Sequence, residues 1–454
     1  MKETRIRTIV VTMLALLCMP ILCCAQNDNT AMEMELEPEA VLHINLQKAV
    51  EIALEENPTI KVADKEIRLK QISNDEAWQN LLPTVSGTGS IQHTLLAAKM
   101  KFGDEEFTMG KNNTNTAALT GTVNLPLFAP AVYQSMKLTR QDVLLAKEKA
   151  RASRLDLVNQ VTKAFYQLLV AKKAMEVMQQ SYKVSSDNYN LINSKFEVGT
   201  VSEYDKISAE VQQRAMSSNL VEATTATTMA ELQLKVLMGI TTDVRFIIDD
   251  ELENHASELI ISNTNDVAEL TNNTTMRQLD LNYKLLQKNL KLQYTNFMPT
   301  LGFQLTGQYQ SLYNDNWDLF NYNWSPSASF AISLNIPIFT ASNWTKIKST
   351  RVQMLQLEDT RENTRRQLSM ALESYRENML AAIAAMESNK VAVEQANKAV
   401  KIAEARYNVG NGTILELNQS EVAMTQAELT YAQSIYTYLV NRSDFDYTLG
   451  REKY

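Results

Sequence analysis

Residues that interrupt helices are scarce in this chain and unevenly placed. The 454 residues include only nine prolines and twelve glycines. No proline occurs from position 131 to 298 or after Pro337. The glycines within those two tracts are Gly199, Gly239, Gly410, Gly412 and Gly450. Because proline and glycine both destabilise helix interiors, the two tracts favour long helices.

Cysteine and histidine are equally scarce, with three of each. The histidines (His43, His93 and His255) are far apart and show no spacing typical of a nucleophile's base or of a metal site. No glycine-rich phosphate loop is found either, so we predict no enzyme, no cofactor and no metal site. The net charge of −8, from 44 basic and 52 acidic residues, argues against a nucleic-acid partner.

The first 25 residues have the pattern of a secretory signal peptide. Lys2, Arg5 and Arg7 precede an apolar run, and Ala25 offers a small residue for cleavage. Acylation of Cys23 or Cys24 is the alternative, although neither follows the small residue usual at a lipoprotein site. Cleavage after Ala25 removes every cysteine, so the mature chain must be stable without disulfides. The acidic stretch 26–41 is expected to be a flexible N-terminus.

The rest of the chain repeats one pattern with an offset of 211 residues. Leu125 to Phe128 correspond to Ile336 to Phe339, and both segments carry an internal proline. The same offset joins Val198-Gly199 with Val409-Gly410 and, further on, Gly239 with Gly450. A constant offset over more than a hundred residues indicates an internal duplication.

Upstream of those prolines, the apolar residues alternate with polar or small ones. The alternating apolar positions are Leu119, Val123 and Leu125 in the first copy and Leu301, Phe303, Leu305, Ala328, Phe330, Ile332, Leu334 and Ile336 in the second. The pattern predicts strands of about ten residues with one apolar face, long enough to span a bilayer when tilted. A soluble pair of hairpins packed on a helix explains it equally well.

Downstream of the prolines, apolar residues recur every seventh position. They are Val161, Leu168, Met175, Tyr182, Tyr189 and Phe196 in the first copy and Leu372, Met379, Met386, Val393, Val400 and Tyr407 in the second. Sustained heptads predict long helices packed as in a coiled coil. We therefore interpret the stripe as helix packing and not as a cofactor site.

Two hairpins supply only four strands, and this number constrains any membrane interpretation. Closed membrane barrels need about eight strands or more, and unpaired strand edges are not tolerated in hydrocarbon. If these strands enter a membrane, several copies of the chain must complete the barrel together. Three copies supply twelve strands (three times four), with six helical hairpins for a tube beneath them.

The ordered double set of motifs carries a resemblance to a known family. The motifs are Ala49, Ala53-Leu54, Asn57-Pro58, Leu82-Pro83, Met298-Pro299, Leu125 to Phe128, Ile336 to Phe339, Phe196 to Gly199 with Asp205 and Ala209, and Arg406 to Gly410 with Glu416. From about Leu46 to Gly450 the chain resembles TolC-type outer-membrane efflux proteins, the outer membrane factors of tripartite export systems. The resemblance implies a mainly α fold with a small membrane β part. Long antiparallel coiled-coil helices would form an α-barrel, continuous with a β-barrel that trimerisation completes.

The repeat and the resemblance together predict how the chain is divided. The units are a signal peptide 1–25, a flexible N-terminus 26–41, a first repeat 42–239, a linker or equatorial segment 240–267, a second repeat 268–450 and an end 451–454. The first repeat would hold a helix, a β-hairpin 84–126 and a helical hairpin 131–239. The second would hold a helix, a β-hairpin 300–337 and a helical hairpin 340–450. The linker is expected to be acidic and irregular.

The resemblance also implies which residues form a site at the helical tips. Asp205 and Tyr407 match an acid and a tyrosine that hold the family's tube closed, and Glu416 matches an acid at its narrowest part. Gly412 and Gln419 depart from the family, which has an arginine and a second acid there, so fewer closing contacts are expected. The implied adaptor-docking tips are Val198, Gly199, Thr200, Val409, Gly410 and Asn411. An acid that only stabilises a helix N-terminus would equally explain Asp205 and Glu416.

The function implied is passive conduction of drugs, other small molecules or proteins through the outer membrane of a Gram-negative bacterium, by a protein with a large periplasmic part. The partners implied are two further copies in a homotrimer, outer-membrane lipid, a periplasmic adaptor (membrane fusion protein) and an inner-membrane pump. The alternative is a soluble periplasmic coiled-coil adaptor or scaffold protein without membrane strands.

Extraction separates these two interpretations. Because a channel's strands are buried in lipid, the protein should stay in the outer-membrane fraction after an alkaline carbonate wash. A peripheral adaptor would be released into the supernatant, and that result would contradict the channel interpretation.

Overall fold

The computed structural model describes residues 42–102, 105–241, 243–256 and 270–452. The predicted signal peptide 1–25, the flexible N-terminus 26–41, residues 257–267 of the predicted linker and residues 453–454 lie outside the described residues. The part that is described is mainly helical and holds one four-stranded sheet. This is the class of fold that the sequence predicts.

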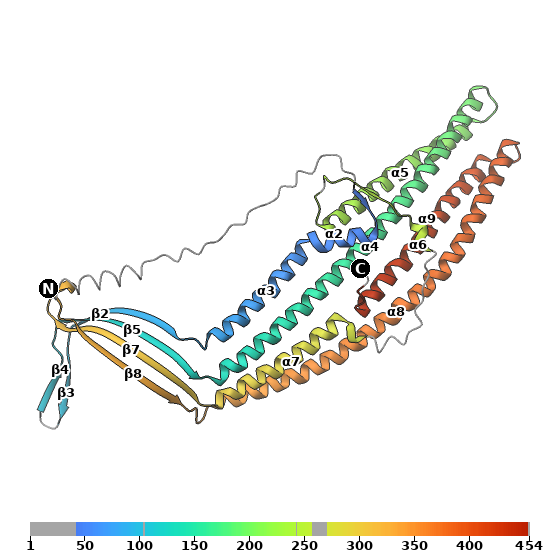
Figure 1. Cartoon of the computed structure of the whole chain (residues 1–454). Helices are drawn as coiled ribbons and strands as arrows, with labels where there is room; N and C mark the ends of the chain where they lie inside the picture. The colour runs from blue at the N-terminus through green and yellow to red at the C-terminus, as the bar shows by residue number, and fades with distance from the viewer. Residues whose placement is uncertain (1–41, 103–104, 242, 257–269, 453–454) are drawn as a thin grey trace. The chain divides into compact units, whose positions relative to one another are not determined.

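From α3 and α7 onward, the two repeats share a helix, two strands of the main sheet and a helical hairpin in the same order (Figure 1). The first repeat consists of α2 (Leu46–Glu56), α3 (Pro58–Gln79), β2 (Thr84–Thr94), β5 (Thr114–Phe128), α4 (Pro130–Glu197) and α5 (Glu203–Met238). The second consists of α7 (Thr274–Tyr294), β7 (Thr300–Asn314), β8 (Ser325–Asn335), α8 (Ala341–Asn408) and α9 (Ile414–Leu449). The bounds of α8 and α9 follow those of α4 and α5 by 211 residues, the offset read from the sequence.

The helices α4 and α8 have 68 residues each, which corresponds to roughly 100 Å at 1.5 Å per residue. No proline or glycine interrupts either helix after its first residue, and the heptad stripe faces inward. Val161 and Leu168 on α4 are buried, as are Leu372, Met379 and Met386 on α8. No helix in the described ranges is both long enough and apolar enough to cross a membrane.

The four strands of the main sheet pair antiparallel in the order β2-β5-β7-β8 (Figure 1). The central pair, β5 with β7, joins the first repeat to the second. The outer strands β2 and β8 each pair on one side only within the sheet. The sequence analysis missed a smaller hairpin, β3 (Ala98–Phe102) with β4 (Glu105–Met109), which lies in the connection between β2 and β5.

Strand register collects the alternating apolar residues into rows across the sheet. One row runs Val85, Val123, Leu305 and Phe330, because each of these residues is paired with the next. The neighbouring row on the other face runs Ser86, Thr122, Thr306 and Ser329. The sheet therefore has an apolar face and a polar face, as the period of two predicts.

The linker is more regular than expected, and this corrects the sequence analysis. Its described part contains β6 (Phe246–Ile248) and α6 (Leu252–Ala256). β6 pairs with β1 (Leu42–Ile44), and Nδ1 of His43 lies 2.8 Å from the Asp249 carboxylate. A partner more than two hundred residues away stabilises this strand, so local sequence alone could not predict it.

The helix α4 is the centre of the helical part and contacts α3, α5, α7 and α9. Its link to α9 includes a polar cluster around Asp444. Nζ of Lys163 lies 3.0 Å from the Asp444 carboxylate, and Nδ2 of Asn159 donates to Asp444 Oδ1 at 2.9 Å. These bonds hold the first repeat against the second.

The last residue of each helical hairpin packs on the turn before the helix that leads to the strands. Gly239 ends α5 in the left-handed conformation (φ 73°), and Asn57, the N-cap of α3, donates Nδ2 to the Leu237 carbonyl at 2.8 Å. In the second repeat, Gly450 has φ 70°, and Asn273 bonds the Thr448 carbonyl at 2.7 Å. Glycine is required because a Cβ on Gly239 would lie 2.9 Å from the Glu56 backbone.

This packing predicts a difference between two glycines of similar φ. Gly239→Ala should lower the thermal unfolding midpoint, followed by helical circular dichroism, because backbone strain of about 1–2 kcal/mol adds to a backbone clash. The matched control is Gly410→Ala (φ 78°), which has nothing within 4 Å of the added methyl and should cost only the strain. Equal losses in the two variants would contradict the packing role.

Candidate functional site: the helical tips

Each helical hairpin reverses through a glycine turn at the end of its long helix. Gly199 follows α4 with φ 76°, and Gly410 follows α8 with φ 78°. The next residues close the turns: the Thr200 amide donates to the Lys195 carbonyl and the Asn411 amide to the Arg406 carbonyl, both at 2.9 Å. This is the Schellman geometry that ends helices at a left-handed glycine.

The return helices start with side-chain caps. Ser202 Oγ accepts from the Asp205 amide at 3.2 Å, and Asp205 Oδ2 accepts from the Ser202 amide at 3.3 Å and from the Ser202 hydroxyl at 2.9 Å. Thr413 caps α9 in the same way, accepting from the Glu416 amide at 3.2 Å. Within the protomer, Asp205 is thus one half of a capping box.

An apolar cluster packs the two hairpins together just above their turns. Ile192 of α4, Ala209 of α5 and both Ile414 and Leu417 of α9 are all buried in it. Half-buried side chains surround this cluster: Tyr189, Val201, Ala403 and Tyr407. Of the predicted site residues, Tyr407 packs against this cluster, which we call the tip cluster.

Tyr407 lies at the edge of the tip cluster with its hydroxyl oxygen buried. That oxygen has no hydrogen-bond partner among the described residues. Burial raises the pKa of Tyr407, and the nearby negative charge of Asp205 raises this pKa further. The two predicted gate residues are thus electrostatic neighbours, yet no hydrogen bond joins them in the described part of this single chain. Whether they form a latch stays a prediction.

Glu416 has an arginine partner that the sequence analysis overlooked. Nη1 of Arg406 lies 3.4 Å from Glu416 Oε2, and Arg406 Nη2 donates to the Asn411 carbonyl at 3.1 Å. A Cβ on Gly412 would lie 3.1 Å from Arg406 Cβ, so a larger residue at 412 would crowd this arginine. A positive charge from the last turn of α8 therefore lies beside Glu416, although position 412 is a glycine. A basic residue in the last helical turn was the signal that could have revealed it.

The extreme tips carry exposed apolar side chains. Val198 is 73% exposed and Val409 is 71% exposed. They are next to the turn residues Gly199, Thr200, Gly410 and Asn411. A Cβ added at either glycine would have no atom within 4 Å. The two valines occupy corresponding positions of the two repeats, 211 residues apart.

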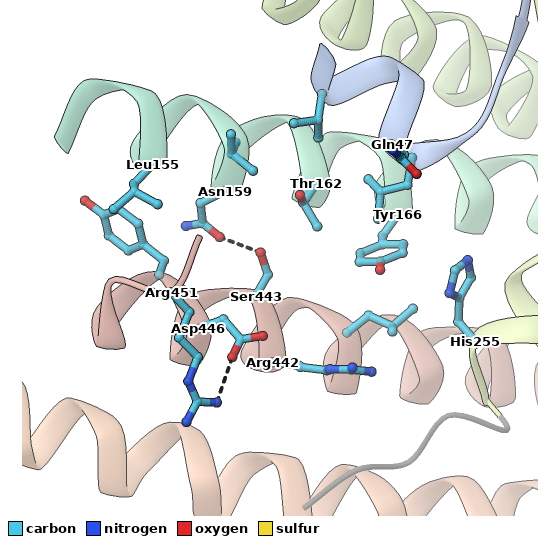
Figure 2. A pocket seen from close by; sticks show the side chains of 15 residues that line it. Gln47, Leu155, Asn159, Thr162, Tyr166, His255, Arg442, Ser443, Asp446 and Arg451 are labelled. Carbon is cyan, nitrogen blue, oxygen red and sulfur yellow. Dashed lines mark hydrogen bonds and ion pairs between the residues drawn. The ribbon is translucent and has the colours of Figure 1, made fainter. Parts of the chain in front are cut away.

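A cavity of about 430 Å³ lies elsewhere, at the junction of α2, α4, α6 and α9 (Figure 2). Ser443 Oγ donates to Asn159 Oδ1 at 2.6 Å, and Asp446 binds Arg451 at 3.2 Å. His255 stands at one end, 5.3 Å from the Tyr166 ring and 2.7 Å from the Asp250 carboxylate. None of the predicted tip residues lines it. In the described ranges, no group of three or more His, Cys, Asp or Glu side chains is placed to hold a metal.

A duplicated chain with a four-stranded, open-edged sheet, helices of roughly 100 Å and paired glycine tips has the architecture of an outer-membrane export channel subunit. A family model described as outer membrane efflux protein matches residues 49–240 and 267–450. The chain belongs to this outer membrane efflux protein family, and the outer membrane is its location. Family membership removes the alternative of a soluble adaptor.

Two curated relatives align with this chain over most of their own length. Outer membrane protein TolC of Vibrio cholerae is 22% identical over 329 residues, which cover 69% of this chain and 73% of the relative. TolC of Salmonella enteritidis is 20% identical over 426 residues, covering 89% of this chain and 82% of the relative.

Solved structures share the fold. A structure of CusC has a TM-score of 0.73 at 15% identity and covers 92% of this chain and 95% of its own. The open state of the MtrE outer membrane channel of Neisseria gonorrhoeae has a TM-score of 0.69 at 19% identity, with coverages of 89% and 88%.

The capping box generates a local prediction. Ser202→Ala removes the side-chain acceptor at the start of α5, so the first turn should lose about 1 kcal/mol and its amides should exchange with deuterium faster. Ser218→Ala, at an exposed position within the same helix, is the control and should leave the exchange unchanged or slower. Unchanged exchange in Ser202→Ala would show that the cap does not hold this turn.

Proposed function

We propose that three copies of this chain form the outer-membrane channel of a tripartite efflux or secretion system. The channel would passively conduct drugs, other small molecules or proteins to the outside. The observation that carries the proposal is the incomplete sheet, because β2 and β8 have open edges and the sheet has one apolar face. Such a sheet is stable in hydrocarbon only if its edges are paired.

The exposed residues of β8 support burial in lipid. Phe330, Ile332 and Leu334 are 73%, 63% and 61% exposed and lie on one face. In water, a patch of this kind is an aggregation hazard, whereas in a membrane the same patch is the lipid-facing surface of a barrel. Pairing β8 of one copy with β2 of the next would close twelve strands (three times four) into such a barrel.

The helical hairpins would then line the tube that leads to the barrel. α4 and α8 begin directly after β5 and β8, so their tips are the ends most distant along the chain from the strands. Val198 and Val409, with Gly199, Thr200, Gly410 and Asn411, are the proposed docking points for a periplasmic adaptor. An inner-membrane pump would deliver cargo through that adaptor.

Asp205, Tyr407 and Glu416 are the proposed gate. A phenol buried without a partner is costly, and a nearby carboxylate is the acceptor that would satisfy it most strongly. A small rotation of the tips would let the Tyr407 hydroxyl donate to Asp205. Glu416 would line the aperture as part of its ion pair with Arg406, whose positive charge offsets that of the carboxylate.

The gate is tested by single-channel conductance in planar bilayers. Tyr407→Phe combined with Asp205→Ala should raise conductance several-fold, because two groups that hold the aperture narrow are removed. Asp205→Ala also breaks the capping box of α5, so Ser202→Ala is the matched control. That control disturbs the same cap and leaves the carboxylate in place, and it should keep the wild-type conductance.

The possible outcomes separate the claims. Increased conductance in Ser202→Ala would assign the effect to a frayed helix and refute the latch. Unchanged conductance in the double variant would refute the latch but leave the channel standing. No conductance from any variant, together with a monomer in mild detergent, would refute the channel itself.

A further inference from the structure

One carboxylate in the second repeat occupies a different environment from its counterpart in the first. Glu421 of α9 corresponds to Glu210 of α5 at the offset of 211 residues. Glu210 forms an ion pair with Arg214 one turn further on, at 2.8 Å. The residue that corresponds to Arg214 is Thr425, so Glu421 has no cation at that place.

Instead, Glu421 points into the seam between the two helical hairpins. Asn188 of α4 donates Nδ2 to Glu421 Oε1 at 2.5 Å. One turn along α9, the hydroxyls of Thr425 and Ser181 are hydrogen-bonded at 2.6 Å, again between α9 and α4. These two bonds span the seam directly above the tip cluster, where any opening of the tips must separate α4 from α9.

A cavity of about 300 Å³ adjoins Glu421 and is lined by four helices. The lining comes from α4, α5, α8 and α9, and its two charged residues, Glu421 and Glu428 of α9, are both acids. Burial raises the pKa of Glu428, which Lys173 of α4 partly offsets.

Three features of its surroundings shift the pKa of Glu421. Burial is the main cause, Glu404 of α8 adds repulsion between like charges, and the Asn188 bond opposes both. Together they raise the pKa of Glu421 to about 7. The pKa of this carboxyl is thus well above that of an exposed glutamate.

We propose that Glu421 is a proton-operated switch in the α4–α9 seam. Protonated Glu421 allows the seam to stay packed, and ionised Glu421 favours its separation and hence a wider aperture. The first repeat lacks this switch because Arg214 neutralises Glu210. The effect on conductance rests on the proposed channel function, whereas the effect on the seam does not.

Proton linkage determines whether a rise in pH favours the packed or the separated seam. The folded seam holds the carboxyl's pKa near 7, while a separated seam exposes the carboxyl to water and returns it toward 4.5. Between these values the packed seam binds more protons, so a rise in pH favours separation, by at most tenfold per pH unit. Above about pH 7 Glu421 is ionised in both the packed and the separated seam, so the ratio of separated to packed seam no longer changes. The total change in this ratio is therefore limited to roughly 300-fold.

The test uses the full-length trimer at pH values from 5 to 8, with two readouts. Hydrogen–deuterium exchange at the seam amides of α9, corrected for the intrinsic pH dependence of exchange, should increase with pH and level off near 7. Conductance in planar bilayers should follow the same curve. Glu421→Gln, which keeps the acceptor for Asn188 without a charge, should flatten both curves at their acidic values.

Two further variants sharpen the result. Glu210→Gln is the matched control at the corresponding position and should retain the wild-type curves. Asn188→Ala removes the bond that favours the ionised form, so its midpoint should move to higher pH. A wild-type pH dependence of exchange in Glu421→Gln would overturn the proposal. A pH-dependent seam without any conductance would support the switch and refute the channel.

Discussion

The structure depends on a sheet that one chain cannot complete. Within the described part of the chain, β2 and β8 pair on one side only, and the apolar row from Val85 to Phe330 is largely exposed. Unpaired edges are costly in hydrocarbon, and apolar surface is costly in water. Pairing with further copies in a membrane resolves both costs, and the long helices that follow β5 and β8 must then surround a common axis.

Internal duplication determines how the helices meet. Both repeats use the same glycine turns, the same cap positions and the same junction between an asparagine N-cap and a left-handed glycine. Contacts between unlike elements hold the repeats together, such as β5 with β7 and the Lys163–Asp444 pair between α4 and α9. The repeats are therefore similar in backbone and different in the side chains at their contact, and that difference makes an asymmetric gate possible.

The tips combine rigid and adjustable parts. The Schellman turns and the caps fix where each helix ends, and the tip cluster packs apolar side chains between the hairpins. Two polar groups lie near this cluster. The buried hydroxyl of Tyr407 has no hydrogen-bond partner among the described residues, and burial raises the pKa of the half-buried Glu421 carboxyl. A buried polar group is costly without a hydrogen-bond partner and favourable with one, so its contribution to stability changes when the helices around it move.

The sequence by itself determined the elements and their repetition. Proline and glycine placement predicted the long helices, heptads predicted their buried stripe, and alternation predicted the two faces of the sheet, because these signals are local and periodic. The β1–β6 pairing, the β3–β4 hairpin and the Arg406–Glu416 pair were not predicted. The Glu210–Arg214 pair lies within one helix, four residues apart. Only the tertiary structure decided that Glu421 faces Asn188, since contacts between distant helices depend on how the two hairpins are rotated against each other.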